Sequence, residues 1–259
     1  GGDGPAFFPH ISEIGEGLGV GVRNWILHHL RCGRSCLAAG RVSYAADCTM
    51  ETARMADLLA PFTGGEAPWL LESLQIYLDR LLLWNARMNL TAVRDPEMIV
   101  TRHFGESLFA ARVLLCGKDE GAAPATLADV GSGAGFPGIP MKLFAPDLEL
   151  TLIESQQKKA TFLREVIRSL GIEGAYVFAG RAEEWERTAG LVTLRAVERF
   201  ELALPVAAKL VAQDGRLGLL VSARQVLTAQ EVLGKQWRWQ EPVAVPLSKA
   251  RVVAVGQRH

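Results

Sequence analysis

The order of hydrophobic and polar positions predicts alternating strands and helices over the second half of the chain. Short apolar runs at Leu127 to Val130 and Leu148 to Ile153 have the length and composition of buried parallel strands. A helix with one apolar and one basic face is expected from Ser155 to Leu170. Further strands are expected at 175–179, 191–196, 216–221, 241–246 and 251–255. This alternation is typical of a doubly wound α/β fold with a mostly parallel, seven-stranded sheet.

A helical segment precedes the predicted sheet. Leucines and aromatic residues recur at helical spacing from Pro68 to Ala86. A second helix is expected to begin with Asp95 as N-cap and Pro96 at its first position, and to run to about Leu115. The sequence therefore predicts a helical N-terminal cap at 66–118 and an α/β domain at 124–259.

Residues 1–49 differ from the rest of the chain. They are rich in Gly, show no sustained period and do not begin with Met. We expect residues 1–65 to be a poorly ordered or non-native extension, and the natural start could be Met50 or Met55. A zinc site is disfavoured because the clustered Cys and His residues have no second half elsewhere in the chain, so no metal is expected. The residues concerned are His28, His29, Cys32 and Cys36.

A glycine-rich turn follows the first predicted strand and opens a helix. Its glycines are Gly131, Gly133 and Gly135, and alternate glycines let the backbone approach a ligand closely. A dinucleotide fingerprint is disfavoured, because Phe136 stands where its third glycine would pack helix against strand. Glu154 ends the second strand about 20 residues later, where an acid can accept hydrogen bonds from ribose hydroxyls. Loop and acid together predict S-adenosylmethionine bound as in class I methyltransferases.

Ligands of such sheets bind at the carboxyl ends of the strands. The predicted site therefore also includes the turn after the third strand, at Arg181–Glu183, and the end of the fourth strand, at Thr193–Arg195. The guanidinium of Arg195 could bind the methionine carboxylate in a bidentate manner or face a nucleic-acid substrate.

Composition limits the class of partner and the compartment. Lys and Arg total 28, equal to Asp and Glu, so only a local basic patch could bind nucleic acid. Four cysteines do not form a disulfide framework, which favours the reducing cytoplasm. No apolar run reaches the roughly 18 residues of a membrane span, so no membrane partner is expected.

The glycine-rich run from Asp129 to Pro140 resembles the RsmG family, formerly called glucose-inhibited division protein B. The resemblance covers about 69–256 and includes several shorter motifs. These are Trp84-Asn85, Asn89-Leu90-Thr91, Asp95-Pro96, Arg102-His103, Gly180 to Glu184 and Arg195-Ala196. It implies a methyltransferase that uses S-adenosylmethionine to methylate N7 of a guanine in the 530-region loop of 16S ribosomal RNA. The expected substrate is the RNA or the 30S subunit, and the expected oligomeric state is a monomer.

The resemblance also assigns site residues. It places cofactor contacts on Gly131, Phe136, Ala182, Glu183 and Arg195, besides the loop glycines and Glu154. Candidate RNA contacts are Arg87, Asn89, Arg102, His103, Lys158, Lys159, Arg181 and Arg224. The chain departs from the family at Glu106 and at Glu154, where the family usually has Asp. A third departure is the absence of the lysine that usually follows the fifth strand, for which Arg224 could substitute.

The predicted chemistry needs few catalytic groups. Guanine N7 carries an unprotonated lone pair, so methyl transfer to it requires positioning rather than a general base. An exocyclic-amine enzyme would need Asp or Asn followed by Pro-Pro after the fourth strand, where this chain has Arg195-Ala196. A C5-pyrimidine enzyme would need a catalytic-domain cysteine. Two alternatives stay open: a class I methyltransferase for a small molecule or protein, and a non-catalytic adenosyl-binding module.

Overall fold

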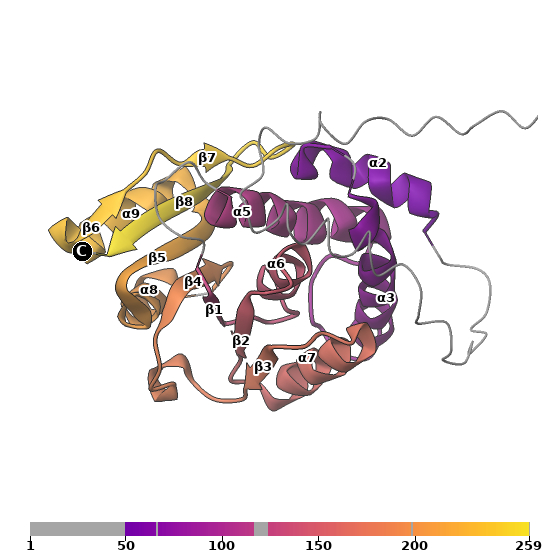
Figure 1. Cartoon of the computed structure of the whole chain (residues 1–259), viewed down its shortest axis with the longest axis horizontal. Helices are drawn as coiled ribbons and strands as arrows, with labels where there is room; N and C mark the ends of the chain where they lie inside the picture. The colour runs from indigo at the N-terminus through magenta and orange to yellow at the C-terminus, as the bar shows by residue number, and fades with distance from the viewer. Residues whose placement is uncertain (1–49, 66, 117–123, 198, 259) are drawn as a thin grey trace, which may run out of the picture. The chain divides into compact units, whose positions relative to one another are not determined.

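The computed structural model of the chain describes residues 50–65, 67–116, 124–197 and 199–258. Its centre is a sheet with strand order β3-β2-β1-β4-β5-β8-β6, and a short β7 pairs with β8 (Figure 1). The strands are β1 (Thr126–Val130), β2 (Glu149–Ile153), β3 (Ala175–Phe178), β4 (Ala189–Arg195), β5 (Val211–Ser222), β6 (Trp237–Trp239), β7 (Val243–Ala244) and β8 (Arg251–Arg258). The Cys and His residues for which a zinc site was disfavoured lie outside the described part.

The doubly wound, mostly parallel sheet is confirmed. Strands β1 to β5 pair in parallel, and β8 runs antiparallel to β5 and β6. The expected closing pair is present as β7 and β8, but the continuous path of seven strands is completed by β6, which the sequence interpretation missed. Its three residues are too few to show a period. Among the residues that the structure describes, the sheet therefore has eight strands rather than seven.

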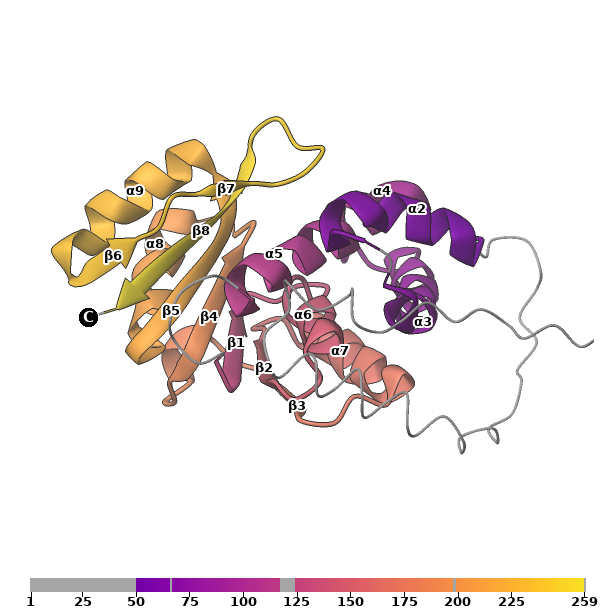
Figure 2. The same ribbon diagram turned by 45° about the horizontal axis from the view of Figure 1, so that its top comes forward.

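Helices cover both faces of the sheet (Figure 2). The α-helices are α2 (Thr52–Thr63), α3 (Pro68–Asn85), α4 (Pro96–Ile99), α5 (Glu106–Leu115), α6 (Gly138–Phe144), α7 (Gln157–Leu170), α8 (Phe200–Lys209) and α9 (Ala223–Leu233). Shorter elements are the π-helix η2 (Val100–Gly105) and the 3₁₀-helices η3 (Ala182–Glu184) and η4 (Gly234–Gln236). Within the part of the chain that the structure describes, we find no helix with the length and apolar content to cross a membrane.

Alternation along the strands divides the core into two hydrophobic clusters. Leu127 and Leu191 belong to the cluster that contains α6, α7 and the N-terminal helices. Ala128 and Val192, one residue further along each strand, belong to the cluster under α8 and α9. Because the N-terminal helices share a cluster with the sheet, the predicted cap at 66–118 packs as part of the same core.

The second predicted helix is interrupted by a π-helix. The predicted N-cap is present, since the Asp95 carboxylate accepts a hydrogen bond from the Met98 N–H at 2.8 Å. After one turn of α4, η2 widens the helix before α5 begins. Gly105 lies at its end, where a Cβ would approach the Phe62 ring to 2.6 Å. A single glycine thus lets α2 pack closely against this widened segment.

Helix α2 falls within the segment predicted to be an extension. Met55, Leu59 and Phe62 are at most 2% exposed, and all three join the larger hydrophobic cluster. Their spacing of four and three residues is a helical signal, but it covers only about two turns and contains Pro61. The structure therefore differs from the prediction over Thr52–Thr63, while residues 1–49 lie outside the described part.

Candidate functional site

The parallel strands bring the predicted site segments to one edge of the sheet. Val130 of β1 pairs with Ile153 of β2 and with Leu194 of β4, so these three strands end side by side. The glycine loop, Glu154 and Arg195 follow or end these strands. The order changes direction at β1, between β2 and β4, which is the topological switch point where open α/β sheets bind ligands.

The glycine loop has a backbone that only glycine adopts easily. Gly131, Gly133 and Gly135 have φ angles of 68°, 57° and 93°. A Cβ on Gly133 would meet nothing nearer than 3.8 Å, so its conformation, not local crowding, requires glycine there. A Cβ on Gly135 would lie 2.5 Å from the Tyr77 hydroxyl, so that glycine faces the protein interior.

Glu154 connects the end of β2 to the glycine loop. Its side chain is buried and accepts hydrogen bonds from the Gly133 N–H at 2.9 Å and from the Gln156 N–H at 2.8 Å. Two backbone donors therefore hold the carboxylate beside the loop. The other lone pairs of its oxygens are still able to accept hydrogen bonds from a ligand.

A pocket of about 550 Å³ opens beside the loop. Four of the predicted residues line it, namely Gly131, Arg181, Ala182 and Glu183. Gly133, Gly135, Phe136, Glu154 and Arg195 do not line it, although Ile153 and Ser155 on either side of Glu154 do. A second hollow of about 670 Å³ lies against β2 and β3 around Tyr176 and contains none of the predicted residues.

Phe136 belongs to an aromatic cluster rather than to the pocket wall. It is 8% exposed, and its ring stacks on Tyr77 of α3 and on His103 of η2, with centroid distances of 5.3 and 4.8 Å. Phe104 adds a tilted contact at 5.6 Å. The predicted cofactor residue Phe136 thus packs the end of the loop against the N-terminal helices.

Asp129 is a buried site residue that the sequence analysis did not select. Its carboxylate is fully buried in β1 and accepts hydrogen bonds from the Thr193 hydroxyl at 2.8 Å and the Gly138 N–H at 3.2 Å. Burial raises the pKa of Asp129 to about 6, although these hydrogen bonds act in the opposite direction. Asp129 therefore braces the loop between β4 and the start of α6. The sequence does contain a signal for this residue, since Asp129 is an acid within an otherwise apolar predicted strand.

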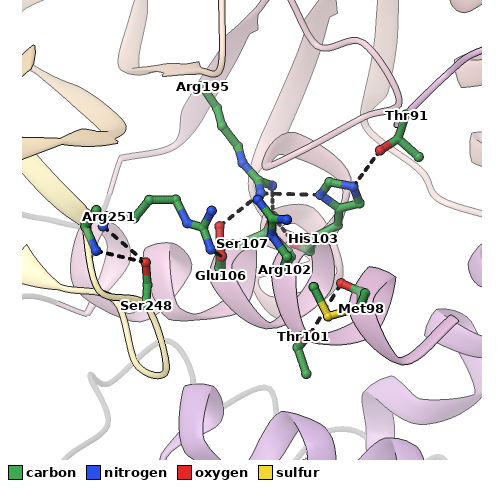
Figure 3. Close-up of polar contacts among 11 residues, drawn as sticks. Thr91, Met98, Thr101, Arg102, His103, Glu106, Ser107, Arg195, Ser248 and Arg251 are labelled. Carbon is green, nitrogen blue, oxygen red and sulfur yellow. Dashed lines mark hydrogen bonds and ion pairs between the residues drawn. The ribbon is translucent and has the colours of Figure 1, made fainter. Parts of the chain in front are cut away.

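Arg195 lies at the centre of a polar network (Figure 3). Its guanidinium donates to the Glu106 carboxylate at 3.0 Å and to the Arg102 backbone carbonyl at 2.5 Å. Longer contacts of 3.4 Å reach the Ser107 hydroxyl and the Nδ1 atom of His103. Arg195 thus joins the end of β4 to η2 and α5. Its guanidinium faces these helices, and its predicted contact with the methionine carboxylate stays a prediction.

Glu106 pairs with two arginines from different strands. Its side chain is 4% exposed, and its second oxygen accepts from Arg251 of β8 at 2.5 Å. Arg195 and Arg251 lie on either side of the carboxylate in Figure 3. Burial raises the pKa of Glu106, while the neighbouring arginines lower it. The acid that differs from the family's usual Asp therefore connects α5 to both β4 and β8.

His103 is held as a neutral imidazole. Arg195 can only donate, so Nδ1 of His103 accepts and its proton lies on Nε2, which is 2.8 Å from the Thr91 hydroxyl. Burial, followed by the charges of Arg195 and Arg102, lowers the pKa of His103 to about 3. His103 therefore packs and hydrogen-bonds within the protein, and its role as an RNA contact stays a prediction.

This low pKa predicts acid sensitivity. An unfolded chain binds a proton at His103 below about pH 6.5, but the folded chain does not until about pH 3, so the stability from the neutral imidazole is lost as pH falls. When the pH falls from 7 to 5, the free energy of unfolding of the wild type should therefore fall by about 2 kcal/mol more than that of His103→Asn. Urea unfolding of both proteins at the two pH values measures this difference. If the two proteins differ in free energy of unfolding by the same amount at both pH values, the low pKa of His103 is contradicted.

The candidate RNA residues other than His103 are mostly at the surface. Arg87 and Asn89 lie after α3, and Lys158 and Lys159 lie in the first turn of α7. All of the candidates except His103 and the half-buried Lys159 are exposed. The list comprises Arg87, Asn89, Arg102, Lys158, Lys159, Arg181 and Arg224. Of these, only Arg181 also lines the pocket. Their position at the surface keeps them as candidate RNA contacts.

Comparison with known proteins gives a consistent result. The family described as rRNA small subunit methyltransferase G, GidB, matches residues 70–252. A relative of that name from Chloroflexus aggregans is 39% identical over 194 residues, which cover 70% of this chain and 79% of the relative. Another from Roseiflexus is 38% identical over 198 residues, which cover 71% and 82%.

A solved structure agrees on the fold. The N-methyltransferase NodS from Bradyrhizobium japonicum, in complex with S-adenosylhomocysteine, superposes with a TM-score of 0.51 at 16% identity. The match covers 70% of this chain and 99% of NodS, and at that identity it shows the class I methyltransferase fold alone. The family match spans the cap, the glycine loop and most of the sheet, and the chain therefore belongs to the rRNA small subunit methyltransferase G family.

Proposed function

We propose that this protein is an S-adenosylmethionine-dependent methyltransferase that methylates N7 of a guanine in the 530-region loop of 16S ribosomal RNA. The observation that carries the proposal is a preformed glycine loop, held by Glu154 next to a pocket at the strand ends, in a chain of this family. We propose the 30S subunit as the physiological form of the substrate, a monomer as the active form and the cytoplasm as the compartment.

The residues at the strand ends fit the cofactor. Gly131 and Gly133 have positive φ, and Gly133 leaves open space where a side chain would stand. Glu154 offers a carboxylate for ribose hydroxyls, and Ala182 and Glu183 line the pocket. These residues would hold S-adenosylmethionine, which supplies a methyl group on a positively charged sulfur.

The remaining groups suit transfer to a nucleophile that needs no deprotonation. His103 is neutral, with its pKa lowered to about 3, and it is hydrogen-bonded at both ring nitrogens. Glu106 is paired with Arg195 and Arg251, and Asp129 is buried in β1. All three side chains bind partners within the protein, so none of them is needed as a general base in an N7 reaction based on positioning. Arg195 and η2 would set where the guanine enters.

The proposal is tested by methyl transfer from labelled S-adenosylmethionine to three substrates. These are 30S subunits lacking the modification, protein-free 16S RNA and a total protein extract. We expect label on the RNA, with the 30S subunit the better substrate. Label on protein alone would favour the protein-methylating alternative, and cofactor binding without transfer to any substrate would favour a non-catalytic module.

Replacement of Glu154 tests the cofactor side of the site. Glu154→Ala removes the acceptor of the Gly133 and Gln156 N–H groups and the proposed ribose contact. We expect the dissociation constant for S-adenosylhomocysteine to rise about 10- to 100-fold. Isothermal titration calorimetry measures it. Glu149→Ala, at the exposed start of β2, is the matched control and should bind like the wild type. Equal effects of the two changes would contradict the role of Glu154.

A further inference from the structure

The glycine loop is also held from the side of the N-terminal helices. Tyr77 of α3 is 0% exposed, and its hydroxyl donates a hydrogen bond to the backbone carbonyl of Ala134, 57 residues further along the chain. Burial raises the pKa of Tyr77 well above 10, so the phenol keeps its proton and acts as the donor. The ring packs on Phe136 and Phe104 at 5.3 and 5.2 Å.

This contact helps to fix the orientation of one peptide unit of the loop, because both its carbonyl and its N–H group are hydrogen-bonded. The Ala134 carbonyl accepts from Tyr77, and the Gly135 N–H of the same peptide donates to the Ser132 carbonyl at 2.7 Å. Because a peptide unit is planar, two opposed hydrogen bonds determine its orientation. Gly135 has a φ of 93° and leaves no room for a Cβ, which would lie 2.5 Å from the Tyr77 oxygen. The third glycine of the loop is thus matched to Tyr77.

The sheet holds the other half of the loop. The N–H groups of Gly131 and Ser132 donate to the Ile153 carbonyl at 2.9 and 3.1 Å, and Gly133 donates to Glu154. Residues 131–133 are therefore fixed by β2, and the peptide after Ala134 is fixed by α3. A loop held at both ends loses less conformational entropy when it binds a ligand than a loop held at one.

We propose that Tyr77 is a positioning residue for the cofactor: its hydroxyl fixes the Ala134–Gly135 peptide and keeps the glycine loop in the shape that binds S-adenosylmethionine. The inference rests on the cofactor assigned in the proposed function, and it extends the site to a helix in the predicted cap. Tyr77 does not line the pocket and need not touch the cofactor.

The test removes only the hydroxyl. Tyr77→Phe keeps the ring and its packing, and the dissociation constant of the full chain for S-adenosylhomocysteine is measured by calorimetry. We expect it to rise about five- to tenfold. Tyr176→Phe removes a hydroxyl from a residue that is 57% exposed, and it should bind like the wild type. Thermal unfolding of each protein without ligand reports stability separately.

A third variant separates positioning from general loss of stability. Phe104→Leu removes a buried ring that packs on Tyr77 but leaves the hydroxyl in place, so it should lower the melting temperature with little change in cofactor affinity. Unchanged affinity of Tyr77→Phe would overturn the inference, as would an equal loss in Phe104→Leu or failure of Tyr77→Phe to fold. A wild-type chain that binds no S-adenosylhomocysteine would instead contradict the proposed function. Weaker binding by Tyr77→Phe would support the inference whether or not RNA is methylated.

Discussion

Arg195→Ala is expected to abolish methyl transfer and to lower the free energy of unfolding by about 2–4 kcal/mol. Its guanidinium is 11% exposed and pairs with the Glu106 carboxylate, which is 4% exposed. Removing it leaves Glu106 with Arg251 alone and leaves the Arg102 carbonyl of η2 without this donor. Because this pair is buried, the substitution should affect the fold as well as the activity.

Activity and stability need separate measurements for this variant. Methylation is followed with labelled cofactor below the melting temperature of the variant, and unfolding is followed in urea. Arg54→Ala is the matched control, because Arg54 of α2 forms an exposed bidentate pair with Glu97 of α4. We expect that control to retain full activity. Near-normal methylation by Arg195→Ala would remove Arg195 from the site.

Gly131→Val is expected to weaken cofactor binding by more than about 100-fold. Gly131 has a φ of 68°, which a β-branched residue adopts only with strain, and its Cβ would come within 3.2 Å of Val197. Both the backbone and the pocket wall would have to move. The strain should also cost about 1–3 kcal/mol of stability. Calorimetry with S-adenosylhomocysteine and urea unfolding measure the two effects.

The chain offers a control with the same backbone strain away from the site. Gly171 ends α7 with a φ of 61°, and nothing lies within 4 Å of a Cβ placed there. Gly171→Val should therefore lose a similar amount of stability but bind the cofactor like the wild type. If both variants lose affinity equally, the effect of Gly131→Val comes from stability and not from the pocket.

Local patterns were enough to predict the parallel strands and the glycine loop. The alternate glycines Gly131, Gly133 and Gly135 predict a backbone with positive φ, which the structure has. A carboxylate after the next strand predicts the ribose contact. These signals lie within a single strand–helix–strand unit, so no distant contact is needed to interpret them. The pocket residues Arg181, Ala182 and Glu183 follow from the rule that ligands lie at the carboxyl ends of parallel strands.

Contacts between distant segments could not be predicted in the same way. Glu106 meets Arg195 across 89 residues, and Tyr77 meets Ala134 across 57. Each depends on how α3, η2 and α5 pack on the sheet, and η2 itself is a widening of the helix that helical spacing does not reveal. Sequence analysis therefore assigned Arg195 to a ligand, whereas the structure shows it bound to the helices beside it.

The most direct test of the account is to map the methylated base. The purified chain is incubated with S-adenosylmethionine and 30S subunits from cells that lack this modification, and the RNA is cleaved chemically at N7-methylguanine. We predict a single new cleavage in the 530-region loop that requires both the chain and the cofactor. Methyl groups on another atom or in another region, or no transfer by a chain that binds the cofactor, would contradict the account.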